Sequence, residues 1–285
     1  MRLKSLHLEH FRRVENVTVE LHPRANLFLG ENAQGKTTIL EAVSYLTTGR
    51  SFRTHRDRDC LRHGRGLHDV TAVEATFERQ GVDHRIRAAF GDTGKSFWID
   101  GKTVTKLGDL WGFLIAVVFI PSDLNVVHGG PTERRSLCDT LLARSQSANL
   151  RIMQNYAVAL RERNALLRQH TPITRTEYDA YEEQMAEYGS RLILARESLM
   201  QRFSVVAQEQ LHALTGRDEP FSIHHDVGFP KTASIKIDTA QEDLRSAMVA
   251  YWKREREHDD DRGYTRHGPH RADLALLLEK KEART

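Results

Sequence analysis

Cysteine, charge of one sign and long apolar runs are all scarce in this chain of 285 residues. The two cysteines, Cys60 and Cys138, lie far apart without C-x-x-C spacing, which excludes a disulfide framework or a zinc knuckle and favours a reducing cytoplasm. The longest uncharged apolar run, residues 110–120, is about half of the roughly 20 residues that cross a bilayer. The amino terminus carries charges where a signal peptide would be apolar. We therefore expect a protein that is neither membrane-spanning nor exported.

Net charge gives little information about partners. The 42 Lys and Arg residues stand against 39 Asp and Glu, which leaves only +3. Bulk electrostatics therefore does not predict nucleic-acid binding, and local patterning has to carry any such case. With 39% hydrophobic and 28% charged residues, the composition is that of a globular protein and excludes disorder or collagen-like repeats.

The first hundred residues predict short strands around one helix. Apolar and polar residues alternate at 3–8, 17–21 and 27–29, and a helical spacing follows in GENAQGKTTILEAVSYLTTG, with Gly49 placed to end the helix. Period two returns between residues 69 and 100 and predicts an antiparallel meander. The apolar run 114–120, rich in Ile, Val and Phe and stopped by Pro121, predicts a buried strand.

Beyond residue 131 the pattern becomes helical. Apolar residues recur at threes and fours over about 150–167 and 178–199, and the break between them holds Pro172 and the capping box from Thr174 to Glu177. This pattern predicts an antiparallel helical hairpin, although two amphipathic helices of a compact bundle would give the same spacing. Short strands at 221–225, 234–237 and 274–278 and a helix at 241–257 are also expected.

A phosphate-binding motif lies between the third predicted strand and the first helix. Gly30, Gly35, Lys36 and Thr37 fit G-x-x-x-x-G-K-[ST]. The glycines allow backbone N–H groups to surround phosphates, Lys36 would reach the β- and γ-phosphates, and the Thr37 hydroxyl would take one position on Mg²⁺. The alternative is a glycine-rich turn that binds no ligand.

Hydrolysis requires a carboxylate at the end of an apolar strand, near the metal. No apolar run in the chain ends in Asp-Glu or Asp-Asp. Asp123, after the predicted strand 114–120, is the remaining weak candidate for a catalytic residue. The sequence thus leaves enzymatic activity open.

The motifs together resemble the RecF family, which belongs with the SMC-like ATP-binding cassette heads. The similarity runs in order through LKSLHLEHFRRVENV, GENAQGKTTILEA, GRSFRT (49–54), FIPSDLNVVHGGPTERRSLCD (119–139), RERNALLRQ (161–169) and YTRHGPHRADL (264–274). The resemblance implies an α/β P-loop NTPase head with a mixed or antiparallel sheet and an α-helical second lobe that carries a short antiparallel hairpin. It implies an ATP-binding head at 1–125, a helical lobe at 126–261 and a return to the head at 262–285.

The resemblance also implies a function. RecF-like proteins bind ATP and Mg²⁺, form ATP-dependent homodimers, bind single-stranded or gapped DNA, and assist recombinase loading and SOS induction together with recombination mediator proteins. Family members are roughly a quarter longer, and the signature, Walker B, D-loop and switch-histidine motifs are missing here. The resemblance therefore predicts a chain shortened at its carboxyl end that does not complete a hydrolytic site alone. Carried over by position, the ATP-binding residues are Gly30, Glu31, Asn32, Ala33, Gln34, Gly35, Lys36, Thr37 and Thr38, and Asp123 approaches the active site.

A basic segment is the best candidate for DNA contact. Six arginines between residues 50 and 65 stand against Asp57 and Asp59, a local charge of +4. A solvated charged surface is the alternative. Two other functions remain open, namely a non-hydrolysing nucleotide-binding scaffold that acts through protein partners and a P-loop phosphotransferase. The candidate DNA-binding residues are Arg50, Arg53, Arg56, Arg58, Arg62 and Arg65, with Arg12 added from the resemblance.

Overall fold

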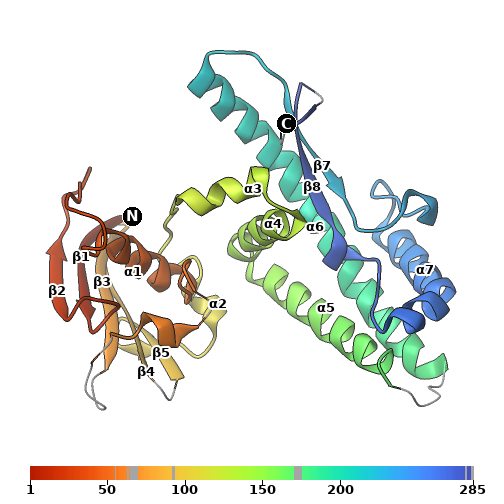
Figure 1. Cartoon of the computed structure of the whole chain (residues 1–285), viewed down its shortest axis with the longest axis horizontal. Helices are drawn as coiled ribbons and strands as arrows, with labels where there is room; N and C mark the ends of the chain where they lie inside the picture. Colours follow the sequence, from red (N-terminus) through yellow and green to blue (C-terminus); the bar gives the residue numbers. More distant parts are fainter. Residues whose placement is uncertain are drawn as a thin grey trace. The chain divides into compact units, whose positions relative to one another are not determined.

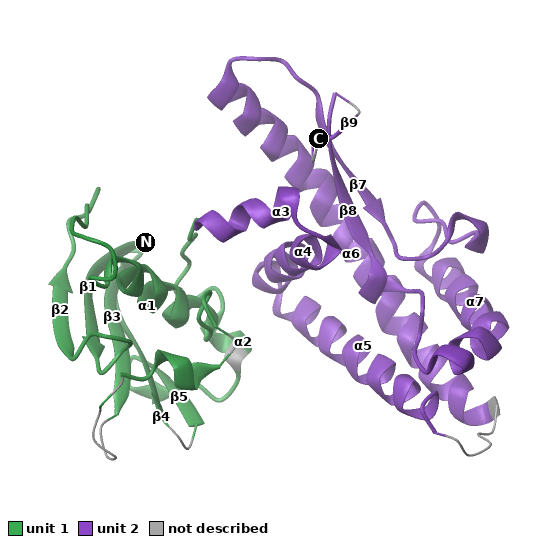
Figure 2. Ribbon diagram, viewed as in Figure 1, with its two compact units in different colours: residues 1–119 green, residues 120–285 purple. Residues whose placement is uncertain are grey.

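The computed structural model describes residues 1–54, 56–62, 64, 70–91, 94–169, 175–279 and 281–283. The chain forms two compact units, Met1–Phe119 and Ile120–Thr285 (Figure 2). The division falls a few residues before the boundary at 125 that the sequence predicts. Residues 262–285 lie within the second unit, and their assignment to an ATP-binding head stays a prediction.

The first unit is built on a six-stranded sheet in the order β2-β1-β3-β4-β5-β6, in which every pairing is antiparallel. The strands β1 and β2 and the meander β3–β5 confirm the period-two predictions (Figure 1). The strands are β1 (Arg2–Glu9), β2 (Asn16–Glu20), β3 (Thr71–Arg79), β4 (Val82–Gly91), β5 (Gly94–Ile99) and β6 (Lys102–Thr103). A short helix α2 (Leu107–Leu110) follows the sheet.

Helix α1 (Lys36–Thr48) packs on this sheet through an aromatic core. Tyr45 stacks on Phe90 with ring centroids 4.9 Å apart, and Phe11 meets both rings edge-on. The helix ends at Gly49, whose φ of 70° is the left-handed conformation that glycine adopts without strain. This packing fixes the start of α1, and with it the preceding glycine-rich loop, relative to the sheet.

Two predicted strands of the first unit are wrong. Residues 27–29 and 114–120 form no strand, and Leu27, Leu29, Val117 and Phe119 are between 75 and 92% exposed. Both segments keep a period-two alternation of burial, but no strand among the described residues pairs with them. An apolar extended segment becomes a strand only when a neighbour accepts and donates its ladder hydrogen bonds.

The second unit is mostly helical, with a three-stranded antiparallel sheet β7-β8-β9 at its side (Figure 1). Its long helices are α4 (Pro131–Ser145), α5 (Ser147–Leu166), α6 (Arg175–Thr215) and α7 (Gln241–Arg262), and α3 (Asn125–His128) precedes them. The strands are β7 (Phe221–Asp226), β8 (Asp273–Leu278) and β9 (Lys281–Glu282). Short 3-10 helices lie at Asp57–Cys60 in the first unit and at Pro121–Leu124, Lys231–Ala233 and Pro269–Arg271 in the second.

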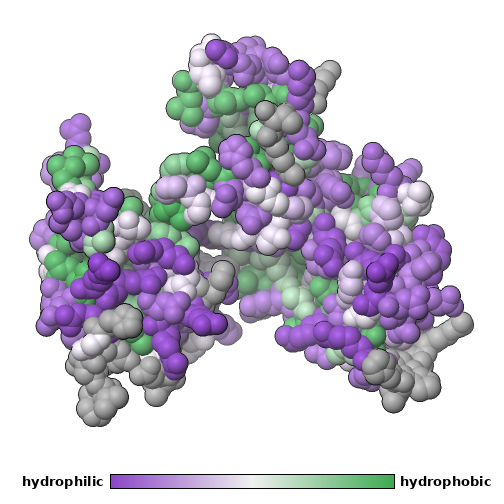
Figure 3. All heavy atoms as spheres, in the orientation of Figure 1, coloured by the Kyte–Doolittle hydropathy of each residue, from purple (hydrophilic) through white to green (hydrophobic). Residues whose placement is uncertain are grey.

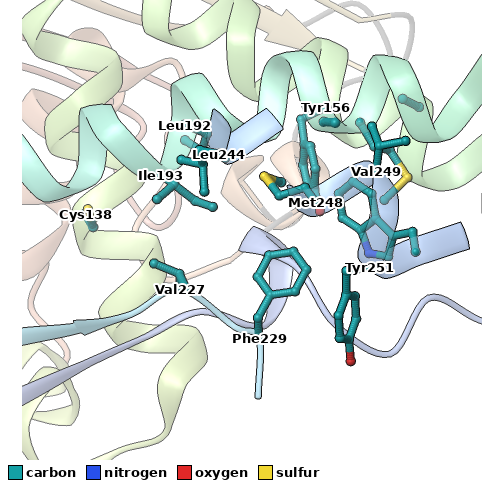
Figure 4. Close-up of a cluster of buried hydrophobic side chains, with 14 of the residues drawn as sticks. Cys138, Tyr156, Leu192, Ile193, Val227, Phe229, Leu244, Met248, Val249 and Tyr251 are labelled. Carbon is teal, nitrogen blue, oxygen red and sulfur yellow. The ribbon is translucent and has the colours of Figure 1, made fainter. Parts of the chain in front are cut away.

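Helices α5 and α6 pack against each other and confirm the predicted helical hairpin, while α6 also packs against α4, α7 and β7. The hairpin is therefore part of a compact core and not a separate arm. The predicted strand 234–237 is wrong, because Ile235 and Ile237 pack individually against this core while the backbone stays irregular. Figure 4 shows Phe229, Tyr251 and Met248 gathered in the core with Tyr156.

A network of buried ion pairs joins α5, α6 and α7. Arg163, which is fully buried, donates to Glu182 at 3.1 Å and to Asp259 at 2.9 Å. Arg256 also pairs with Glu182, and Arg266 with Asp259. Each buried carboxylate of the network therefore has two cationic partners, which is what allows charge to be buried among three helices.

Hydrophilic residues cover most of the face seen in Figure 3, and hydrophobic residues gather there in patches. Within the described ranges, no helix is both long and apolar enough to span a membrane.

Candidate nucleotide-binding site

The loop before α1 is shaped by residues with left-handed backbone conformations. Ala33 and Gly35 have φ values of 67° and 96°, and Gly35 is the residue that precedes the first turn of α1. Gly30 has a φ of 151°, and a Cβ placed there would lie 2.3 Å from Oε1 of Gln34. Because Gln34 Oε1 accepts the Glu31 N–H at 3.1 Å, a side chain at position 30 would displace this contact. The glycines are thus required by the path of the loop.

Lys36 lies at the centre of this loop. Its Nζ donates to the carbonyl oxygens of Gly30 at 2.7 Å and of Glu31 at 2.6 Å. The ammonium group therefore closes the loop on itself and lies among backbone groups of residues 30–35. A phosphate oxygen could replace these carbonyl oxygens as the acceptor of the Lys36 hydrogen bonds, since both kinds of oxygen accept from an ammonium group.

A cavity of about 640 Å³ opens beside the loop. It contains six of the nine predicted ATP-binding residues, while Gly30, Glu31 and Gln34 shape the loop without lining the cavity. Four cationic side chains and one carboxylate line it, so that the cavity favours an anion. The lining residues are Arg12, Arg13, Asn32, Ala33, Gly35, Lys36, Thr37, Thr38, Arg53, Asp59 and Leu61.

The amino end of α1 adds to this preference. The first N–H groups of a helix have no acceptor within the helix, and the aligned peptide dipoles place partial positive charge at that end. Thr37 and Thr38, in the first turn, line the cavity with the helix start. A phosphate group in the cavity would therefore meet backbone donors, hydroxyls and cations together.

A buried carboxylate lies one helical turn behind Thr37. Glu41 is fully buried and accepts hydrogen bonds from Arg12, Ser51 and Arg53. Burial lowers the pKa of the Arg12 guanidinium, but the hydrogen bond to Glu41 and the neighbouring acidic groups together more than offset this, and the net pKa is raised above its ordinary value. Burial also raises the pKa of the neighbouring Cys60 thiol to about 11, so that the thiol stays protonated and unreactive at neutral pH.

The structure separates the candidate DNA-binding arginines. Arg12 and Arg53 line the cavity beside the loop, whereas Arg62 pairs with Glu15 at 2.9 Å. Three others lie on the exposed surface of the segment that follows α1, and Arg65 lies outside the described residues. The three exposed arginines are Arg50, Arg56 and Arg58.

Asp123, the weak catalytic candidate, lies in the second unit. Its Oδ2 accepts the backbone N–H of Ile120 at 2.9 Å and caps the short 3-10 helix Pro121–Leu124. Its catalytic role stays a prediction. In the part of the chain that the structure describes, no cluster of three or more His, Cys, Asp or Glu side chains could hold a metal ion.

Glu41 and Arg13 are two residues of this site that were not predicted from the sequence. Glu41 lies four positions after Thr37, on the face of α1 that also carries Ala42 and Tyr45. A charged residue on such a buried helix face is a signal for a carboxylate with partners. Arg13 adjoins Arg12 and lines the same cavity. In the sequence, its position next to Arg12 is the one sign that sets it apart from an ordinary surface arginine.

The AAA domain family matches residues 5–282. A DNA replication and repair protein RecF from Thermosynechococcus vestitus is 34% identical over 287 residues, which cover the whole of this chain and 74% of that protein. The RecF of Myxococcus xanthus is 32% identical and is covered to 73%. The chain thus spans about three quarters of the length of these relatives.

A solved structure described as the recombination mediator protein RecF with ATP, in the RecFOR pathway, is also similar. It superposes with a TM-score of 0.90 over 99% of this chain and 74% of that chain, at 23% identity. At this identity the likeness establishes the fold.

Proposed function

This chain belongs to the RecF family of DNA replication and repair proteins, and from that membership we propose that it is an ATP-binding, DNA-binding protein of recombinational repair. The single observation that carries the proposal is the cationic cavity beside the loop 30–35 and the amino end of α1. The similar solved structure is described as holding ATP, and its fold matches over 99% of this chain.

The donor set suits the triphosphate of ATP. Lys36 and the arginines at the cavity supply charge, and the Gly35–Thr37 backbone would supply N–H groups. Thr37 would contribute a single hydroxyl to Mg²⁺, which keeps several waters and binds through phosphate oxygens, so that one protein ligand is sufficient. The bound metal would neutralise phosphate charge, while the chain itself holds and orients the nucleotide.

DNA contact is proposed for the exposed part of the basic segment, at Arg50, Arg56 and Arg58. Arginines that neutralise backbone phosphates position DNA without reading its sequence, which suits single-stranded or gapped substrates. An ATP-dependent homodimer, recombination mediator proteins as partners, and action in the cytoplasm complete the proposal by family membership.

Nucleotide binding is tested with Lys36→Ala against Lys102→Ala, an exposed lysine on β6 of the same unit. We expect Lys36→Ala to lose ATP affinity with an unchanged unfolding transition, and Lys102→Ala to match the parent chain. Fluorescence titration with a labelled ATP measures both. Equal ATP affinity in the two variants would refute the assignment of the loop.

DNA binding is tested by titrating labelled single-stranded DNA with and without ATP at several salt concentrations. Arg56→Ala and Arg58→Ala, which leave the cavity lining intact, should each weaken binding and reduce the salt dependence by about one phosphate contact. Arg24→Ala, an exposed arginine outside the segment, is the control. An affinity that is indifferent to ATP, salt and both substitutions would remove DNA binding from the proposal. A turnover assay of Asp123→Asn tests the candidate catalytic carboxylate.

A further inference from the structure

Glu41 is the one fully buried carboxylate of the described part of the first unit, and no phosphate-binding motif includes it. It lies on α1 four residues after Thr37, on the same helix face and one turn deeper than the cavity lining. A buried carboxylate is costly unless charged or hydrogen-bonded partners compensate for the lost water. Its partners therefore indicate why a carboxylate is placed there.

Arg12 is the main partner. Its Nε lies 3.2 and 3.1 Å from the two Glu41 oxygens, and its Nη2 donates to Oε1. Its Nη1 donates to the carbonyl oxygen of Asp59. These contacts use three of the five N–H groups of the guanidinium and fix its plane, while the side chain still lines the cavity.

A second set of contacts comes from the segment after α1. Ser51 donates its hydroxyl to Glu41 Oε1, and Arg53 Nη1 lies 3.5 Å from Oε2. The Arg53 side chain is 48% exposed and also lines the cavity, whereas that of Arg12 is 18% exposed. One carboxylate thus holds two arginines that come from different loops and meet at the same cavity.

We propose that Glu41 is a positioning residue that holds Arg12 and Arg53 at the phosphate cavity, so that both guanidiniums meet the polyphosphate of a nucleoside triphosphate. The inference rests on the proposed binding of ATP at the same cavity. Glu41 does not touch the ligand. It fixes the direction of the two guanidinium groups before the ligand arrives. Less conformational freedom is then lost on binding, and preorganised donors bind anions more tightly.

A purely structural carboxylate would have a different signature. It would lower the free energy of unfolding when removed and leave the affinity of the folded protein for phosphates unchanged. If Glu41 acts mainly through Arg12, most of its effect on affinity is lost once the Arg12 side chain is gone, and only the part that acts through Arg53 remains. The comparison of single and double variants separates the two roles.

The experiment measures the affinity of the full chain for ATP and for inorganic tripolyphosphate in Glu41→Gln, Arg12→Ala and the double variant. Glu20→Gln, an exposed glutamate on β2, is the control. We expect Glu41→Gln to weaken both ligands by about tenfold, since charge-assisted hydrogen bonds are lost. In the Arg12→Ala background the same substitution should weaken either affinity by no more than about threefold, because only the long contact of Arg53 with Glu41 remains.

Equal losses in the two backgrounds, or an unchanged affinity of folded Glu41→Gln, would overturn the inference. Arg12→Lys tests it without altering the buried carboxylate, because a lysine keeps the charge but cannot hold Glu41 and the Asp59 carbonyl in one plane. We expect it to weaken both ligands, and an Arg12→Lys protein with parental affinity would also overturn the inference. Parental binding of tripolyphosphate without binding of ATP would refute the proposed function while the variants still test Glu41, and binding of neither would refute both.

Discussion

Replacing Arg163 by methionine is the sharpest test of how the second unit is held together. Its guanidinium donates to Glu182, Asp259 and the Thr265 hydroxyl, and both Arg163 and Glu182 are fully buried. Methionine fills much of the same space but leaves the two carboxylates with one cationic partner each, Arg256 and Arg266. The substitution thus removes two of the four ion pairs that these arginines make with Glu182 and Asp259.

The expected cost follows from the partners that remain. Removing one member of a fully buried ion pair costs about 3–5 kcal/mol, because the other charge stays buried. The side chains of Arg256 and Arg266 are only 16 and 27% exposed, and each still pairs with one of the two carboxylates. These remaining pairs reduce the cost of removing Arg163. We therefore expect a decrease of about 3 kcal/mol in the free energy of unfolding. Combining Arg163→Met with Glu182→Gln should cost less than the sum of the two single losses by about 1 kcal/mol or more.

Urea unfolding followed by tryptophan fluorescence measures these values. Of the three tryptophans, Trp252 is the one in the second unit, so a background of Trp98→Phe and Trp111→Phe makes the signal report on that unit. Arg161→Met is the matched control, since Arg161 lies on the same helix with a side chain that is 68% exposed. A loss for Arg163→Met no larger than that for Arg161→Met, or strictly additive losses in the double variant, would show that the network does not hold the helices.

Two further predictions concern the second unit. His270 accepts a hydrogen bond from the Tyr156 hydroxyl at 2.8 Å, and burial lowers the pKa of His270 from 6.5 to about 4. The unfolded chain therefore binds the proton more readily than the folded chain. Up to about 3 kcal/mol of stability is lost as pH falls from about 6.5 to about 4. Urea unfolding at pH 7.5 and 4.5 should show a smaller pH difference for His270→Gln than for the parent. Gly228→Ala should destabilise the unit by about 2–4 kcal/mol in the same assay, because its Cβ would lie 2.2 Å from the Gly268 carbonyl oxygen at a φ of 81°.

Each of these predictions has a matched control. His258→Gln changes an exposed histidine on α7 and should keep the parental pH difference, and if His270→Gln kept it too, the buried histidine would not be the titrating group. Gly216→Ala places a Cβ in open space at a φ of 67° and should cost only about 1 kcal/mol, the cost of the left-handed backbone. Similar losses at Gly216 and Gly228 would refute the argument from close backbone approach.

Local pattern was enough to locate the strands β1 to β5 and the helices α1, α5 and α7. These elements are predictable because their hydrophobic periodicity can be recognised within a short window of consecutive residues. The long helix α6 runs to Thr215, beyond the predicted seam, and the first glycine after it is Gly216. Residues 200–215 contain no proline or glycine, which was a usable signal that the helix continues to that point.

Pairing and burial of charge were not predictable from pattern. Residues 27–29 and 114–120 have the composition of strands, but a strand depends on a neighbour that no local window contains. Asp259 belongs to an acidic run that suggests solvent, yet it is buried against Arg163, which lies 96 residues away in the sequence. Glu41 likewise needed the positions of Arg12 and Arg53, which come from separate loops.

The large side chains left in water at residues 27, 29, 117 and 119 have a consequence for handling the protein. Attraction between apolar surfaces weakens on cooling, because apolar hydration has little enthalpy near room temperature and a large heat capacity. Solutions of this chain should therefore stay clear in the cold and become turbid on mild warming, well below the temperature at which either unit melts. Sulfate should lower the clouding temperature, since it strengthens association of exposed apolar groups.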